Sequence, residues 1–202
     1  MDILLNLPYT PLDDLYIGVE RIKYGWMDLC IAVNGKSFTY GASYLSDPVD
    51  DLLTAAVSII KKDRLAVSHY NLKEIGDFIY VTHELEPGLV TWLFRYTDNK
   101  LTLIIWEDMP TDFDELIEAR FESQSDKVQK FDAIPDLTQE LLFALNGSAV
   151  PFIKALINTF TSIDKLERFE DDSNGHDWGF TYSIDNLNFL KEWLSKNDAL
   201  IN

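Results

Sequence analysis

The sequence of 202 residues has 34 acidic and 17 basic side chains, so its net charge is −17 at pH 7. Its hydrophobic share of 47% and its charged share of 25% are ordinary for a soluble globular protein and exclude a disordered chain. The charge excludes passive binding to nucleic acid, whose phosphates must be met by Lys and Arg, and it argues against binding to an anionic membrane surface.

Cysteine use and the start of the chain bear on the compartment. Cys30 is the only cysteine, which excludes an intramolecular disulfide and a disulfide-stapled secreted scaffold. The first residues lack the basic start of a signal peptide and their apolar stretch breaks at Pro8. The most apolar windows, Leu52–Ile60 and Leu101–Trp106, are too short to span a bilayer. We therefore expect a cytoplasmic protein.

The first predicted element is a β-hairpin. Trp26–Asn34 alternates apolar and polar residues, and Lys36–Tyr44 does so again after the Asn34-Gly35 pair. This pair is typical of a type I′ turn, in which both central residues adopt a positive φ. Cys30 lies on the first of these strands, where it is expected to be a small buried residue rather than a catalytic thiol.

A helix and three strands follow. Ser46 or Asp47 can cap a helix whose first turn accepts Pro48, and apolar residues recur at helical spacing up to Lys62. We expect the helix Pro48–Lys62 to pack on the apolar face of the hairpin. Short turns, including Glu86-Pro87-Gly88, connect the next strands, which must then form an antiparallel meander. These strands are predicted over Asp77–Glu84, Leu89–Tyr96 and Leu101–Glu107, with Val90, Trp92, Phe94 and Tyr96 on one face of the second.

The second half of the chain is expected to be mainly helical. From Asp136, leucines at 137, 141, 142 and 145 repeat at three and four residues, a second helix is expected from Pro151, and Ser183 caps a last one. Trp178–Tyr182 is a candidate short strand, and the acidic stretch before residue 127 is compatible with a helix turn or an edge strand. The predicted fold is α+β: an antiparallel sheet of hairpin plus meander, packed against helices, in a single domain of residues 1–202. A boundary could lie only near residues 108–127.

No motif assigns a catalytic residue, a cofactor or a metal ligand. The sequence has no glycine-rich phosphate loop, no G-x-S-x-G elbow and no C-x-x-C pair. His83 adjoins Glu84 at a strand end, but adjacent strand residues point to opposite faces, so we expect a surface histidine beside a turn. His176-Asp177 follows Asp171-Asp172 without the spacing of a calcium loop, which favours a solvated acidic loop.

The candidate functional residues are acids and aromatics that could contact a basic protein. Trp92, Trp106 and Trp193 are expected to pack in the core, whereas Trp26 and Trp178 are expected to be partly exposed. Aromatic side chains dominate interface hot spots and charges set the rate of approach. The candidates for partner binding are Trp26, Asp108, Asp112, Asp114, Glu115, Glu118, Glu122, Glu170, Asp171, Asp172 and Trp178.

Two motifs carry a resemblance to a known class of proteins. They are Ser43-Tyr44-Leu45-Ser46-Asp47, which leads into a helix, and Glu86-Pro87-Gly88, which is followed by Trp92 in the next strand. Together they resemble small, mostly uncharacterised acidic bacterial α+β proteins of the immunity-protein type, which neutralise toxins used between competing bacteria. The resemblance covers residues 24–107 and consists of a cap and a turn, so it transfers no functional residue.

Three functions remain open. The leading hypothesis is a non-enzymatic module that binds a basic partner, such as an immunity-type inhibitor that occludes a toxin. The second is a hydrolase that uses carboxylates or a divalent cation. The third is a scaffold or regulatory subunit, and the sequence does not fix the oligomeric state.

Overall fold

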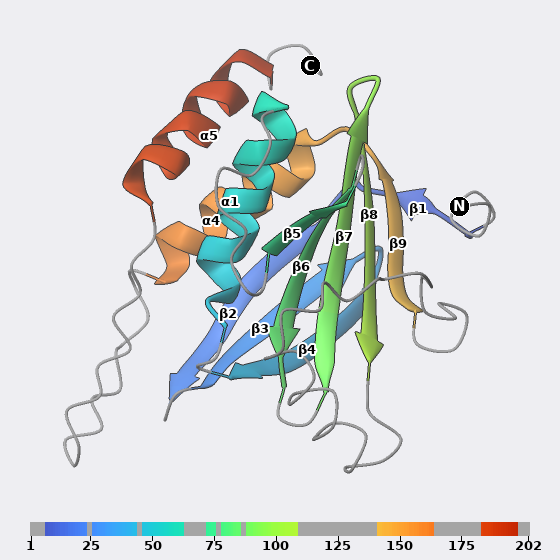
Figure 1. The fold of residues 1–202 in the computed structure, drawn as a ribbon, viewed down its shortest axis with the longest axis vertical. Helices are drawn as coiled ribbons and strands as arrows, with labels where there is room; N and C mark the ends of the chain where they lie inside the picture. Colours follow the sequence, from blue (N-terminus) through green and yellow to red (C-terminus); the bar gives the residue numbers. More distant parts are fainter. Residues whose placement is uncertain are drawn as a thin grey trace.

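In the part of the chain that the structure describes, two β-sheets and three helices form an α+β fold (Figure 1). The computed structural model describes residues 7–23, 26–43, 46–62, 72–75, 78–85, 88–108, 141–163 and 183–197. Its elements are β1 (Thr10–Pro11), β2 (Tyr16–Lys23), β3 (Trp26–Val33), β4 (Lys36–Ser43), α1 (Pro48–Lys61), β5 (Leu72–Ile75), β6 (Phe78–Glu84), β7 (Leu89–Thr97), β8 (Lys100–Asp108), β9 (Leu141–Gly147), α4 (Val150–Ile163) and α5 (Ile184–Asn197).

The small sheet has the strand order β2-β3-β4 and is antiparallel throughout. The predicted hairpin is confirmed: Asn34 and Gly35 have φ values of 51° and 77°, as a type I′ turn requires. The register between β2 and β3 shifts between Val19 and Arg21, which leaves one extra residue in β2 as a bulge. The third strand, β2, is absent from the sequence prediction.

The large sheet has the order β1-β9-β8-β7-β6-β5, and it contains the predicted meander as β6, β7 and β8. All its pairs are antiparallel except β1 and β9, which run parallel. The prediction of a helix through Leu141, Leu142 and Leu145 is wrong, because these residues form β9. Both faces of this strand carry at least partly buried apolar residues, and such a continuous apolar run has no period that separates a strand from a helix.

The three helices begin where the sequence indicates. The Asp47 side chain accepts a hydrogen bond of 3.2 Å from the Asp50 amide and so caps α1, and the Ser183 hydroxyl accepts one of 3.2 Å from the Asn186 amide and caps α5. However, α1 packs mainly on β6 and β7 of the large sheet, not on the hairpin, while α4 packs on β2. In the described part of the chain, no helix is long and apolar enough to cross a membrane.

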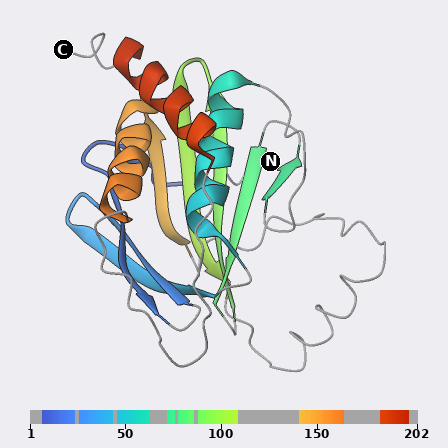
Figure 2. The same ribbon diagram turned by 90° about the vertical axis from the view of Figure 1, so that its left-hand side faces the viewer.

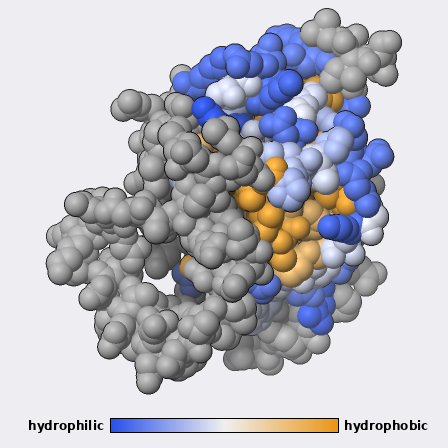
Figure 3. All heavy atoms as spheres, turned by 90° about the vertical axis from the view of Figure 1, so that its right-hand side faces the viewer, coloured by the Kyte–Doolittle hydropathy of each residue, from blue (hydrophilic) through white to orange (hydrophobic). Residues whose placement is uncertain are grey.

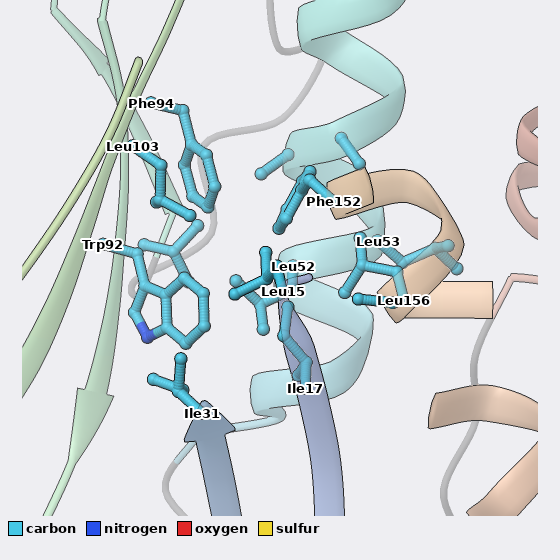
Figure 4. Close-up of a cluster of buried hydrophobic side chains, with 14 of the residues drawn as sticks. Leu15, Ile17, Ile31, Leu52, Leu53, Trp92, Phe94, Leu103, Phe152 and Leu156 are labelled. Atoms are coloured by element: carbon cyan, nitrogen blue, oxygen red, sulfur yellow. The ribbon is translucent and has the colours of Figure 1, made fainter. Parts of the chain in front are cut away.

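Helices α1, α4 and α5 lie together on one side of the large sheet (Figure 2). One hydrophobic cluster joins the inner faces of both sheets to these helices. Figure 4 shows its centre, where side chains of the large sheet face those of the helices and the small sheet, namely Trp92, Phe94, Leu103, Leu52, Leu53, Phe152, Leu156, Leu15, Ile17 and Ile31. Large aromatic and aliphatic side chains of this kind contribute most of the burial free energy of a domain. The predicted core positions of Trp92 and its neighbours in β7 are therefore confirmed.

A second, smaller cluster lies on the outer face of the large sheet. Leu93, Ile104 and Trp106 are buried there, with partly buried apolar residues around them. Hydrophobic surface also appears on the side of the molecule that carries β1 and β9 (Figure 3). Leu141 of β9 is partly buried against the outer cluster, whereas Leu142 packs against the inner one. Both faces of the large sheet are thus apolar at its centre, although the sequence alternation indicated only the inner one.

Candidate functional site

Most of the predicted partner-binding residues lie outside the described residues. These are Asp112, Asp114, Glu115, Glu118, Glu122, Glu170, Asp171, Asp172 and Trp178. The other two belong to different sheets: Trp26 begins β3, and Asp108 ends β8 opposite Leu89. The undecided helix turn or edge strand before residue 127, the Trp178–Tyr182 strand and the His176 loop also fall outside the described residues.

The negative charge divides unevenly along the sequence. The described residues contain 14 acids and 11 bases, so they are nearly balanced, whereas the rest of the chain contains 20 acids and 6 bases. The surplus belongs mainly to two stretches of sequence, residues 109–140 and 164–182. The described residues therefore contribute little of the net charge.

The outward-facing surface of the small sheet is the part of the framework that presents aromatic side chains among small residues. Inward-facing residues such as Ile17, Leu29 and Tyr40 are buried in the core, so the alternate residues of each strand face outward. We call these residues the small-sheet face: Tyr16, Gly18, Trp26, Asp28, Cys30, Ala32, Ser37, Thr39 and Gly41. Trp26 is half-buried, as its sequence position predicted, and Cys30 is buried.

Two aromatic rings of this face lie over glycines. A Cβ atom at Gly18 would overlap the Tyr16 ring, and one at Gly41 would lie 3.5 Å from Trp26 Cε3. Tyr16 is nevertheless 53% exposed, which is unusual for so large a side chain in a strand. The two rings start from opposite ends of the sheet, since Tyr16 pairs with Ala32 and Trp26 with Ser43.

An ion pair crosses the same sheet between the two aromatic residues. Arg21 Nε lies 2.7 Å from Asp28 Oδ2, and the Asp28 side chain is 22% exposed. Such a partly exposed pair contributes little to stability, but it fixes the position of a carboxylate beside Trp26. Tyr16 is not among the residues predicted from the sequence, where only the short alternation of Ile17 and Val19 with Gly18 indicates the strand that carries it.

A buried polar group connects the two sheets at their inner faces. His83 is fully buried, so its predicted surface position is wrong; it shares the strand phase of Ile79 and Val81, which point into the core. Its Nδ1 lies 2.5 Å from the Tyr40 hydroxyl, which also accepts a 3.1 Å hydrogen bond from Trp92 Nε1. Burial lowers the pKa of His83 to about 3.

A second buried ionisable group lies at the start of α1. Asp51 is 8% exposed, and its Oδ2 atom has no hydrogen-bond partner among the described residues. Burial, and then the charges of Asp47 and Asp50, raise the pKa of Asp51 to about 7. Asp50 Oδ1 meanwhile accepts a 3.1 Å hydrogen bond from the Ser183 amide, which connects the first turn of α1 to the start of α5.

The described residues do not assemble a recognisable metal centre. Within the described ranges, no group of three His, Cys, Asp or Glu side chains is placed to hold a metal ion. His83 and Glu84 point to opposite faces of β6, as their adjacent positions predicted. Comparison with known proteins found no matching family model, no matching curated protein and no matching solved structure.

Proposed function

We propose that this protein is a non-enzymatic module that binds a basic protein partner, and that it acts as an immunity-type inhibitor by covering the partner's active site. The observation that carries the proposal is the small-sheet face, which combines the exposed Tyr16 ring with the half-buried Trp26 ring. Tyr and Trp are the residues most enriched among interface hot spots.

The geometry of the two rings supports an anchoring role. Each lies against a glycine, so its position is set by packing before a partner arrives. A preordered side chain loses less conformational entropy on binding than a free one, which leaves more of its burial free energy for affinity. The Asp28 carboxylate beside Trp26 adds an acceptor for a basic side chain of the partner.

The charge of the sequence supports the choice of a basic partner. A protein with a net charge of −17 attracts positively charged proteins over long distances and repels acidic ones. This attraction raises the association rate, whereas aromatic anchors mainly lower the dissociation rate. The two contributions can therefore be measured separately.

The first step is to read the genes that adjoin the gene of this chain, and the probe is a basic protein that one of them encodes. We expect its association rate constant to fall about tenfold or more between about 20 mM and about 200 mM salt. Trp26→Ala should raise the dissociation rate about 30-fold, which corresponds to about 2 kcal/mol for a hot-spot aromatic, without changing the salt dependence.

Two further variants make the test specific. Ile184→Ala removes another exposed apolar side chain, one that is 65% exposed in α5, and it should leave both rates unchanged. Gly18→Ala displaces the Tyr16 ring without removing it and should also speed dissociation. A basic neighbour that does not bind, or that binds equally well to Trp26→Ala and wild type, contradicts the proposal.

A further inference from the structure

The fully buried His83 lies at a junction between the two sheets. It belongs to β6 of the large sheet, Tyr40 belongs to β4 of the small sheet, and Trp92 belongs to β7. The rings of Tyr40 and His83 are nearly parallel, at 22° with centroids 5.8 Å apart. We call these three residues the sheet junction.

Donor and acceptor chemistry fixes the protonation state of the junction. The Trp92 indole N–H can only donate, so the Tyr40 oxygen accepts its hydrogen bond. Tyr40 then donates its single hydrogen to His83 Nδ1. The proton of the neutral imidazole must therefore be on Nε2, which is buried and has no partner among the described residues.

Protonation of His83 would break this arrangement. Nδ1 would become a donor, so the Tyr40 hydroxyl hydrogen would lose its acceptor, and a cation would be buried without a counter-charge. Removal of one hydrogen-bond partner inside a protein leaves the other with the full cost of its desolvation. The charged junction is thus compatible only with a state that admits water.

The groups around His83 do not offset this cost. Tyr40 is the titratable group that faces it from β4, Trp92 from β7 does not titrate, and β5 pairs only with residues 78–81 of β6. Glu84 is on the opposite face of β6, and α1, which packs on β6, has Asp50 and Asp51 in its first turn. Burial alone lowers the pKa of His83, without a contribution from any of these charges.

We propose that the sheet junction is an acid-sensitive contact: neutral His83 holds β4 against β6, and protonation of His83 opens the contact between the two sheets before the helices unfold. The opened state takes up one proton on a histidine with an ordinary pKa of about 6.5. Its population should therefore rise about tenfold for each pH unit below 6.5, down to the pKa of the buried group.

Hydrogen exchange followed by NMR tests the proposal on the intact chain. Protection factors, corrected for the intrinsic pH dependence of exchange, should fall about tenfold per pH unit for amides of β4 and β6 between pH 6 and pH 4. Amides of α4 should keep their protection over the same range. In His83→Asn, whose side-chain oxygen can replace Nδ1 as acceptor, protection of β4 should not vary with pH.

Controls keep the outcome decisive. His176→Asn makes the same chemical change at a histidine that the sequence places in an acidic loop, and it should retain the wild-type response. If His83→Asn does not fold, ¹⁵N shifts of the wild-type imidazole decide: a proton on Nδ1, or titration of His83 above pH 5, overturns the proposal. Equal loss of protection in β4 and α4 overturns it as well.

Discussion

Replacement of the buried Asp51 carboxyl by an amide should stabilise the protein at alkaline pH. Its Oδ2 atom has no hydrogen-bond partner among the described residues, and the neighbouring carboxylates of Asp47 and Asp50 repel its charge. Burial and this repulsion raise its pKa from 3.8 to about 7. The folded state therefore holds a proton on Asp51 more tightly than the unfolded state does.

The sign and size of the effect follow from proton linkage. Because the pKa of an acid is raised on folding, stability is greatest below the unfolded pKa of 3.8 and falls as the pH rises through about 7. A shift of about three pH units corresponds to about 4 kcal/mol, which is an upper limit. The amide introduced by Asp51→Asn would need partners for its own N–H groups, so we expect this variant to gain about 1–3 kcal/mol at pH 8.

Urea unfolding of wild type and Asp51→Asn at pH 4 to 8, followed by circular dichroism, measures this difference. The gain should appear at pH 8 and become small near pH 4, because that pH lies close to the unfolded pKa of 3.8 and far below the folded pKa of about 7. Asp185→Asn makes the same chemical change at an exposed acid in the first turn of α5 and should not reproduce the gain at pH 8. A variant that is less stable than wild type at pH 8 would refute the reasoning.

The same measurement reveals a balance between Asp51 and His83. The pKa of His83 is lowered on folding, so its contribution to the free energy of unfolding is lost as the pH falls from about 6.5 toward 3. Between about pH 4 and 6.5 the two groups have opposite slopes and nearly cancel in wild type. As the pH falls over this range, Asp51→Asn should therefore lose stability steadily, while His83→Asn should gain it.

Three further predictions concern packing and backbone geometry. Gly35→Ala should lower the free energy of unfolding in chemical denaturation by about 1 kcal/mol or more, because a φ of 77° disfavours a side chain. Gly41→Ala should lower it by less than about 0.5 kcal/mol, because the added Cβ makes only ordinary contacts. Equal costs for the two variants would contradict this assignment. Thr159→Val should lower the free energy of unfolding by about 1–2 kcal/mol, because the Thr159 hydroxyl lies 2.6 Å from the Ile17 carbonyl oxygen of β2. An unchanged denaturation midpoint would show that this hydrogen bond does not stabilise the fold. Trp92→Phe should lower the free energy of unfolding by about 2–4 kcal/mol, because it leaves a cavity and removes the hydrogen bond to Tyr40. An unaltered Tm in thermal unfolding would contradict this prediction.

The sequence predicts those elements whose signal is local. The hairpin turn needs only Asn34-Gly35, and α1 needs only Asp47 before Pro48, so both could be placed from neighbouring residues. The short β1 and the strand β9 depend on pairing between segments far apart in the chain, such as Thr10 with Leu145. No local pattern encodes such a pairing, and β9 reads as a helix in isolation.

The candidate site was predictable in part for the same reason. Trp26 follows from its place at a strand end, but Tyr16 could not be identified without the strand β2 that carries it. The surface position predicted for His83 is wrong because a strand end beside an acid and a turn is typical of an exposed residue, whereas the strand phase with Ile79 and Val81 places its side chain in the core. A polar residue at a core position breaks the apolar pattern of a strand. Whether it is buried depends on hydrogen-bond partners from other strands, which the local sequence does not reveal.

The contact of α4 with β2 sets an order for the appearance of structure during synthesis. The three strands of the small sheet are complete once residue 43 has left the ribosome, yet the helix that covers β2 ends only at Ile163. For those 120 residues the nascent chain has an apolar sheet surface without its helix, which is the kind of surface that chaperones bind. Long separations of this kind slow folding, so the chain should acquire its final form late and from its C-terminal part.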